Sequence, residues 1–185
     1  MNKVIILLFL GVAVLAGYFG LGCKPCGNSQ ESVKCQRSLG GKGNYDNILV
    51  TRAVDGDTLV LENNERLRLI GIDTPEMHES NKLNRDVQRS GQSVESIQQL
   101  GRRSYEFTKK LVEGKRVKLE LDVEKQDKYK RTLAYVYLED GTFVNAKIVQ
   151  EGYASLMTYP PNVKYADLFL KLYQEARQNK RGLWQ

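Results

Sequence analysis

The sequence has few prolines, which disordered chains often contain in abundance, and few cysteines and histidines, which commonly bind metals. Its 185 residues include only four prolines, three cysteines and one histidine. The shortage of proline and the absence of low-complexity tracts argue against broad disorder, and the chain contains no internal repeat. Its length is sufficient for one domain with a buried core.

The three cysteines do not form a complete zinc motif. Cys23, Cys26 and Cys35 follow a C-x2-C-x8-C spacing, but no histidine lies nearby to complete a tetrahedral shell. In an exported chain, Cys26 and Cys35 can pair if Cys23 is lipidated or cleaved away, and the alternative is three unpaired thiols. Residues 23–46 are rich in Gly, Ser, Asn and Lys, which predicts a flexible linker.

The charge balance is moderately basic. The chain carries 28 Lys and Arg against 22 Asp and Glu, for a formal net charge of +6. This excess suits a polyanionic partner, but it also occurs in many proteins that bind nothing anionic. Charge alone therefore decides nothing about the ligand.

Residues 1–22 form the one long apolar run. Lys3 is followed by an uncharged stretch from Val4 to Leu21, which approaches the length that crosses a bilayer. A small-x-small pattern at 20–22 and Cys23 directly after it allow three alternatives: an uncleaved anchor, a lipidated cysteine or a released protein. All three predict an extracytoplasmic domain, and we favour a membrane-anchored one.

The folded domain is predicted to span residues 47–185. A β-branched run at 48–54 ends at Asp55-Gly56, a strong turn signal between strands. Two further strands at 58–62 and 66–72 complete an antiparallel meander. The polar segment at 78–91 has few apolar residues, and we interpret it as an exposed loop.

The second half of the domain mixes helices and strands. Ser93 can cap a helix with an apolar face that continues to Gly114. Strands are expected at 117–122 and 132–138, and helices at 144–150 and 164–180, with Trp184 packing as an anchor. This order predicts an α+β fold: a five-stranded OB-type β-barrel with about three helices, preceded by the apolar N-terminal segment.

Two acids mark a candidate metal site. Asp57 and Asp73 each lie next to an apolar strand, so both can reach one mouth of the barrel. Two carboxylates, with carbonyl and water oxygens, match the ligands of Ca²⁺. The alternative is that the acids of the Asp-Gly-Asp segment at 55–57 are ordinary turn residues.

Two arginines and a third acid are further candidate residues for a hydrolytic site. Arg68 and Arg131 are candidate phosphate clamps, because guanidinium presents a planar fork to two phosphate oxygens, although a solvated surface role is the common alternative. Glu76 can take a proton from an attacking water, or it is simply a loop or helix-start charge. His78 is interpreted as a surface residue. Together with a metal ion, these groups fit phosphodiester hydrolysis.

Strand parity imposes a condition on this site. Arg68 and Asp73 are separated by an odd number of residues, so a regular strand would point them to opposite faces. They converge only if the chain bends before Asp73. Gly71 and Pro75 are the residues that favour such a bend.

Three motifs in this order resemble the staphylococcal nuclease family. They are Asp-Gly-Asp-Thr at 55–58, the Arg68–Glu76 segment, and the Asp-Lys-Tyr-Lys-Arg-Thr-Leu-Ala-Tyr segment at 127–135. The resemblance extends over about residues 47–184. It implies an OB-type barrel and a Ca²⁺-dependent nuclease that acts on DNA and RNA.

The resemblance also assigns roles by position. Tyr159 matches a nucleotide-contacting tyrosine, but its usual companion two residues earlier is Met157 here, and Lys130 stands where the family often has glycine. The segment after Glu76 is longer than in the best-known member. The implied roles are calcium ligation by Asp57, Asp73 and the Thr74 carbonyl, phosphate binding by Arg68 and Arg131, proton abstraction by Glu76, and nucleotide contact by Lys128, Tyr129 and Tyr159.

The sequence therefore predicts an exported, metal-dependent nuclease. The alternatives are a noncatalytic nucleic-acid-binding domain of the same fold and an anchored module for some other acidic partner. The presence of all five acids and arginines of the implied site favours the enzyme. The expected partners are DNA and RNA, with membrane attachment through the N-terminal segment or a lipidated Cys23, and the expected state is a monomer.

Overall fold

The structure, a computed structural model, describes residues 45–185. The predicted signal or anchor at 1–22 and all three cysteines lie outside the described residues. Among residues 45–185, no helix is both long and apolar enough to span a bilayer. Tyr45 packs against the core, and its carbonyl accepts a 2.8 Å hydrogen bond from the Leu119 N–H, so ordered contacts precede the predicted domain boundary.

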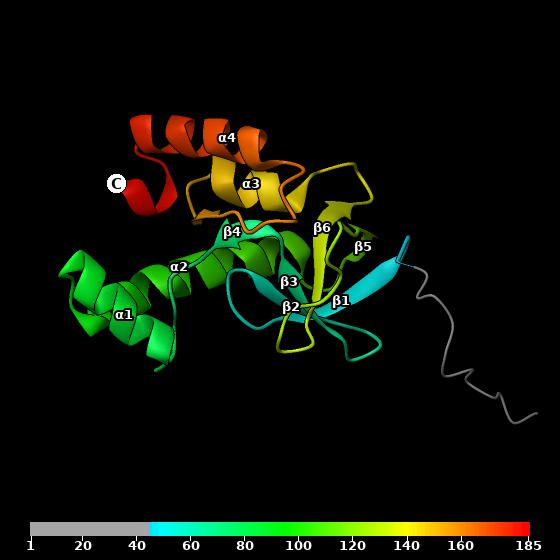
Figure 1. The fold of residues 1–185 in the computed structure, drawn as a ribbon, viewed down its shortest axis with the longest axis horizontal. Helices are drawn as coiled ribbons and strands as arrows, with labels where there is room; N and C mark the ends of the chain where they lie inside the picture. Colours follow the sequence, from blue (N-terminus) through cyan, green and yellow to red (C-terminus); the bar gives the residue numbers. More distant parts are fainter. Residues whose placement is uncertain (1–44) are drawn as a thin grey trace, which may run out of the picture. The chain divides into compact units, whose positions relative to one another are not determined.

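Five strands form a closed barrel, as the sequence predicted (Figure 1). The neighbours around the barrel run in the order β1-β2-β3-β6-β5, and β5 returns to pair with β1. Closure removes the exposed edges that an open sheet of this size would present. The strands are β1 (Ile48–Ala53), β2 (Thr58–Leu61), β3 (Arg66–Leu69), β5 (Arg116–Glu120) and β6 (Thr132–Leu138).

Meander order holds only for the first three strands. β1, β2 and β3 pair antiparallel through the turns at 55–57 and 62–65, but β3 then pairs with β6 in parallel. Parallel neighbours need a crossover connection, and the helices between β3 and β5 lie in that connection. The predicted antiparallel meander of the first three strands is therefore confirmed, and the parallel pairing with β6 is an addition that the sequence did not predict.

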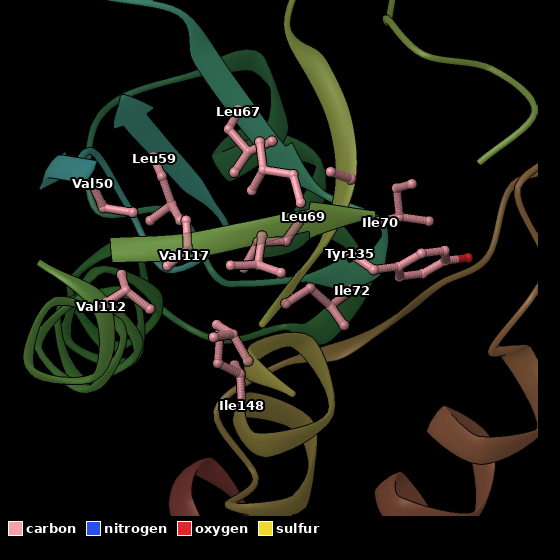
Figure 2. Packing of buried hydrophobic residues seen from close by; sticks show 14 of the residues in the cluster. Val50, Leu59, Leu67, Leu69, Ile70, Ile72, Val112, Val117, Tyr135 and Ile148 are labelled. Atoms are coloured by element: carbon pink, nitrogen blue, oxygen red, sulfur yellow. The ribbon is translucent and has the colours of Figure 1, made fainter. Parts of the chain in front are cut away.

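Alternate side chains of the strands fill the barrel interior. Leu59 and Leu61 of β2 and Leu67 and Leu69 of β3 are buried, whereas the residues between them are partly exposed. Figure 2 shows Leu59, Leu67 and Leu69 among the core side chains. Two-residue alternation produces this pattern because successive side chains of a strand point to opposite faces. The site residues that follow are held by this rigid core.

The predicted third strand at 66–72 is broken in the structure. It ends at Leu69, and β4 (Gly71–Asp73) belongs to a separate two-stranded sheet with β7 (Ser155–Met157). Gly71 has φ of 82°, a left-handed conformation that ends regular strand geometry and that glycine adopts readily. The sequence predicted the need for a break near this position, and the structure confirms it, but β7 was not predicted.

The segment 78–91 was predicted to be a loop, and this prediction was wrong. The segment contains helix α1 (Asn81–Ser90). The Ser80 side chain accepts the Leu83 N–H over 3.0 Å as an N-cap, and Gly91 ends the helix with φ of 68°. Leu83 is buried. Capping at both ends and a buried leucine stabilise this helix. It was not predicted because the segment has few apolar residues.

The other helices cover the barrel, close to their predicted positions. α2 (Val94–Val112) is capped by Ser93 as predicted, and α1 packs against it (Figure 1). α3 (Val144–Gln150) and α4 (Ala166–Gln178) pack side by side, and the 3-10 turn η1 (Gly182–Trp184) follows. Trp184 anchors the C-terminus as predicted, with its ring edge against Tyr173.

Candidate active site

Asp57 lies at the base of the site, immediately before β2. It is buried and pairs with the Arg68 guanidinium, and it also accepts hydrogen bonds from the Thr74 N–H (3.0 Å) and Thr74 hydroxyl (3.1 Å). Burial alone would raise the pKa of Asp57, but the charges of Arg68 and Lys82 outweigh burial and hold that pKa below its ordinary value. Asp57 is therefore an ionised group inside the fold.

Arg68 connects two carboxylates, one from the turn before β2 and one from β4. It leaves β3, contacts Asp57, and donates from Nη2 to Asp73 Oδ1 over 2.9 Å. The same Nη2 donates to the Ile72 carbonyl over 3.3 Å. These contacts hold the guanidinium at the site in one orientation.

Lys82 of α1 occupies the acidic end of the site. Its Nζ donates to the Thr74 carbonyl (2.6 Å), Asp73 Oδ1 (2.8 Å) and Glu76 Oε1 (3.1 Å). Burial lowers the pKa of Lys82, but the neighbouring carboxylates, Asp73 foremost, outweigh it and raise the pKa overall, so the ammonium stays charged.

Sequence reasoning missed Lys82 because the segment 78–91 was interpreted as a loop. The signals that could have found it are the serine N-cap at Ser80 and the glycine at position 91, which together delimit a helix. That helix begins close enough to Glu76 to bring its first turn to the site.

Asp55 supports Asp57 from the turn before β2. The Asp57 N–H donates to Asp55 Oδ1 over 3.2 Å. Burial, followed by the charge of Asp57, raises the pKa of Asp55 to about 7. Both causes disfavour the ionised form of Asp55, burial because it removes water from the carboxylate and Asp57 because it adds a repelling charge.

Arg131 enters from the opposite side, at the end of the turn 127–131. Its Nε and Nη2 both donate to Asp127 Oδ2 over 2.7 Å, and Nη1 lies 3.5 Å from the Thr58 hydroxyl. The Asp127 carboxylate also accepts the N–H groups of Tyr129 and Arg131. One carboxylate thus shapes the turn and orients the arginine.

One open cavity of about 570 Å³ brings most predicted site residues together. Tyr129 and Tyr159 are 68% and 75% exposed at its edge, where Lys128 lies 5.1 Å over the Tyr129 ring. Arg85 of α1 and Met157 of β7 also line it. The predicted site residues in its lining are Arg68, Asp73, Glu76, Lys128, Tyr129, Arg131 and Tyr159.

Three predicted or considered residues lie outside this lining. Asp57 is buried behind Arg68, and Thr74 is buried and lines a smaller hollow of about 230 Å³ together with Asp73. His78 is exposed and lines a separate hollow beside Arg102. The cavity therefore joins arginines and acids without the histidine.

The oxygen atoms at the acidic end suit a hard cation. Carboxylate and carbonyl oxygens of Asp73, Thr74 and Glu76 converge on one compact positive group, the Lys82 ammonium. Oxygen donors of these types are the ligands that Ca²⁺ prefers. Within residues 45–185, no three His, Cys, Asp or Glu side chains are grouped so that they could hold a metal ion by themselves, and Arg68 and Lys82 lie among the acids.

Comparison with known proteins agrees with this geometry. The model of the staphylococcal nuclease homologue family matches residues 66–185. The thermonuclease of Staphylococcus intermedius is 40% identical over 143 residues, covering 76% of this chain and 77% of that protein. The thermonuclease of Staphylococcus hyicus is 33% identical over 144 residues, covering 76% and 77%. Endonuclease YncB of Bacillus subtilis is 35% identical over 143 residues, covering 75% and 61%.

Proposed function

The chain belongs to the staphylococcal nuclease family, as its three motifs predicted, and from this we propose that it is a Ca²⁺-dependent nuclease that hydrolyses DNA and RNA outside the cytoplasm. The observation that carries the proposal is the convergence of Arg68, Arg131, Asp73 and Glu76 on one open cavity. Nucleic-acid backbones are polyanions, and the two guanidinium groups supply the charge that a bound phosphate requires.

Arg68 and Arg131 bind and orient the scissile phosphate. Each is held by at least one carboxylate, Arg68 by Asp57 and Asp73 and Arg131 by Asp127, so little reorganisation is needed when the phosphate arrives. Fixed donors of this kind stabilise the extra negative charge of the transition state better than mobile water does.

Glu76 accepts the proton of the attacking water at its carboxylate. It lines the cavity beside Asp73, so its carboxylate is available at the site. A carboxylate is a suitable proton acceptor when it lies within hydrogen-bond reach of the water. Asp57, Asp73 and the Thr74 carbonyl would hold the Ca²⁺ ion, whose positive charge offsets that of the phosphate.

The exposed rings at the cavity edge bind the nucleotide. Tyr129 and Tyr159 present open faces on which bases can stack, and Lys128 offers charge to a terminal phosphate. Stacking is tolerant of base identity, which fits a nuclease that takes both DNA and RNA. Met157, which contacts Arg68 and lines the same cavity as Tyr159, offers a softer contact than a second ring.

A nuclease assay of the full chain tests the proposal. Cleavage of single-stranded DNA and RNA is expected with Ca²⁺ and is lost with a chelator, and Mg²⁺ provides the comparison. The Arg68→Ala and Glu76→Ala variants are expected to lose about 100- to 1000-fold in kcat. Arg52→Ala removes an exposed strand arginine outside the cavity and is the matched control. Equal activity in all four proteins would overturn the mechanism, and binding without cleavage would favour the noncatalytic alternative.

We place the enzyme on the outer side of a membrane, anchored through residues 1–22 or a lipidated Cys23, and we expect it to act as a monomer. The apolar run from Val4 to Leu21 supports this placement. Membrane fractionation of the chain and of Cys23→Ser separates the alternatives. Release of the variant into the soluble fraction would exclude a spanning helix as the sole anchor, whereas retention would exclude lipid as the sole anchor.

A further inference from the structure

Lys82 has the surroundings of a bound cation rather than of a surface lysine. Three oxygens from three different residues lie around its Nζ: the Thr74 carbonyl at 2.6 Å, Asp73 Oδ1 at 2.8 Å and Glu76 Oε1 at 3.1 Å. Asp73 and Thr74 are residues to which the proposed function assigns Ca²⁺. The ammonium and the metal would therefore compete for the same oxygen atoms.

Electrostatic repulsion disfavours two cations around these oxygens. Asp57, Asp73 and Glu76 are the negative groups here, and Arg68 and Lys82 are the positive groups paired with them. Replacing the single charge of Lys82 with a divalent ion improves the local charge balance. Leaving the ammonium beside that ion would add a repulsion at close range.

Lys82 is positioned to leave without unfolding its helix. It is the second residue of α1, and its side chain is 21% exposed. The start of α1 is instead held by the Ser80 cap and by buried Leu83. The flexible four-carbon stem of lysine lets the ammonium move into solvent while the backbone stays in place.

We propose that Lys82 is an intramolecular cation that neutralises the metal-binding oxygens of the metal-free enzyme, and that Ca²⁺ binds by displacing it. Lys82 thereby sets the Ca²⁺ concentration at which the site fills. The inference rests on the proposed function, because it concerns regulation of the same site. It does not follow from the three family motifs, because Lys82 lies on α1, outside all of them.

Calorimetric titration of Ca²⁺ into the full chain tests the proposal without any activity measurement. Lys82→Gln is expected to bind Ca²⁺ with a Kd about tenfold lower than the unaltered chain, because the competitor is gone. Lys82→Met, which keeps the aliphatic stem, should behave in the same way. Arg85→Gln removes a positive charge from the same helix and is the matched control, with a much smaller change expected.

Thermal unfolding in the presence of a chelator gives a second readout. Without Ca²⁺, both Lys82 variants should unfold at a lower temperature than the unaltered chain. Saturating Ca²⁺ should raise their unfolding temperature by more than it raises that of the unaltered chain. A Kd in Lys82→Gln and Lys82→Met that is unchanged or higher would overturn the inference and leave the proposed function intact. Absence of Ca²⁺ binding in every protein would overturn both.

Discussion

Arg68 Nη2 lies 2.9 Å from Asp73 Oδ1, although the two residues are five positions apart and a continuous strand would point them to opposite faces. The pair forms because β3 ends at Leu69 and the chain passes through Gly71, at φ of 82°, into a different sheet. The break thus turns the Asp73 carboxylate toward the arginine.

Gly71→Ala is expected to destabilise the fold and disturb this pair. The left-handed backbone costs alanine about 1 kcal/mol, and its Cβ would lie 2.5 Å from Phe169, which adds about 1–3 kcal/mol. Gly141 has φ of 83° with open space around it, so Gly141→Ala measures the backbone cost alone. Urea unfolding of both variants gives the comparison. If both variants lose the same unfolding free energy, the Phe169 side chain accommodates the new Cβ without cost.

Asp127→Ala is expected to lower activity through Arg131. Asp127 Oδ2 accepts two 2.7 Å hydrogen bonds from that guanidinium, so its removal frees the arginine to adopt other orientations. A loss of about tenfold in kcat/KM is expected, against about 100- to 1000-fold for Arg131→Ala. The double variant should be no worse than Arg131→Ala alone. Fully additive losses would mean that Asp127 acts independently of Arg131.

Asn145→Ala is expected to cost about 1–3 kcal/mol of unfolding free energy. The buried Asn145 side chain donates to the Ile70 carbonyl over 3.0 Å and accepts the Val136 N–H over 2.9 Å, so it ties α3 to the strand break and to β6. Asn179→Ala removes an exposed side-chain hydrogen bond at the end of α4 and should change stability by no more than about 0.5 kcal/mol. Chemical denaturation distinguishes the two, and a small effect at Asn145 would contradict the expectation.

Glu120 is expected to make stability depend on acid pH. Burial alone raises its pKa, but hydrogen bonds from Lys164, Tyr165 and Tyr137 outweigh burial and lower the pKa overall. Because the pKa of Glu120 is lower in the folded state, its ionised form stabilises the fold at pH values above the unfolded-state pKa of about 4.3. This stabilisation is lost as the pH falls through the folded-state pKa.

The stability difference between the unaltered chain and Glu120→Gln should therefore be largest near pH 7 and shrink as pH falls below about 4. Denaturant unfolding at several pH values measures it. Glu139→Gln alters an exposed glutamate in the turn after β6 and is the control. A difference that stays constant with pH would contradict the assignment.

Much of the candidate site was predictable because its residues lie in or next to strands and turns that short sequence patterns indicate. The turn before Asp57 is marked by Asp-Gly, and Arg68 lies in an alternating strand. Strand parity required a bend if Arg68 and Asp73 were to meet, and Gly71 and Pro75 indicated where it would lie. What the sequence could not reveal is that Arg68 lies between two carboxylates and that Asp127 orients Arg131, because side-chain contacts depend on rotamers fixed by packing.

The sequence by itself determined the barrel strands and the main helices, since two-residue alternation, helical periodicity and capping residues act between near neighbours. Only the tertiary structure decided the parallel pairing of β3 with β6, the small sheet of β4 with β7, and the position of Lys82 among the acids. Each of the two strand pairings joins segments more than sixty residues apart, and α1 packs through buried Leu83. Local patterns carry no information on such partners, because the folded core alone brings them together.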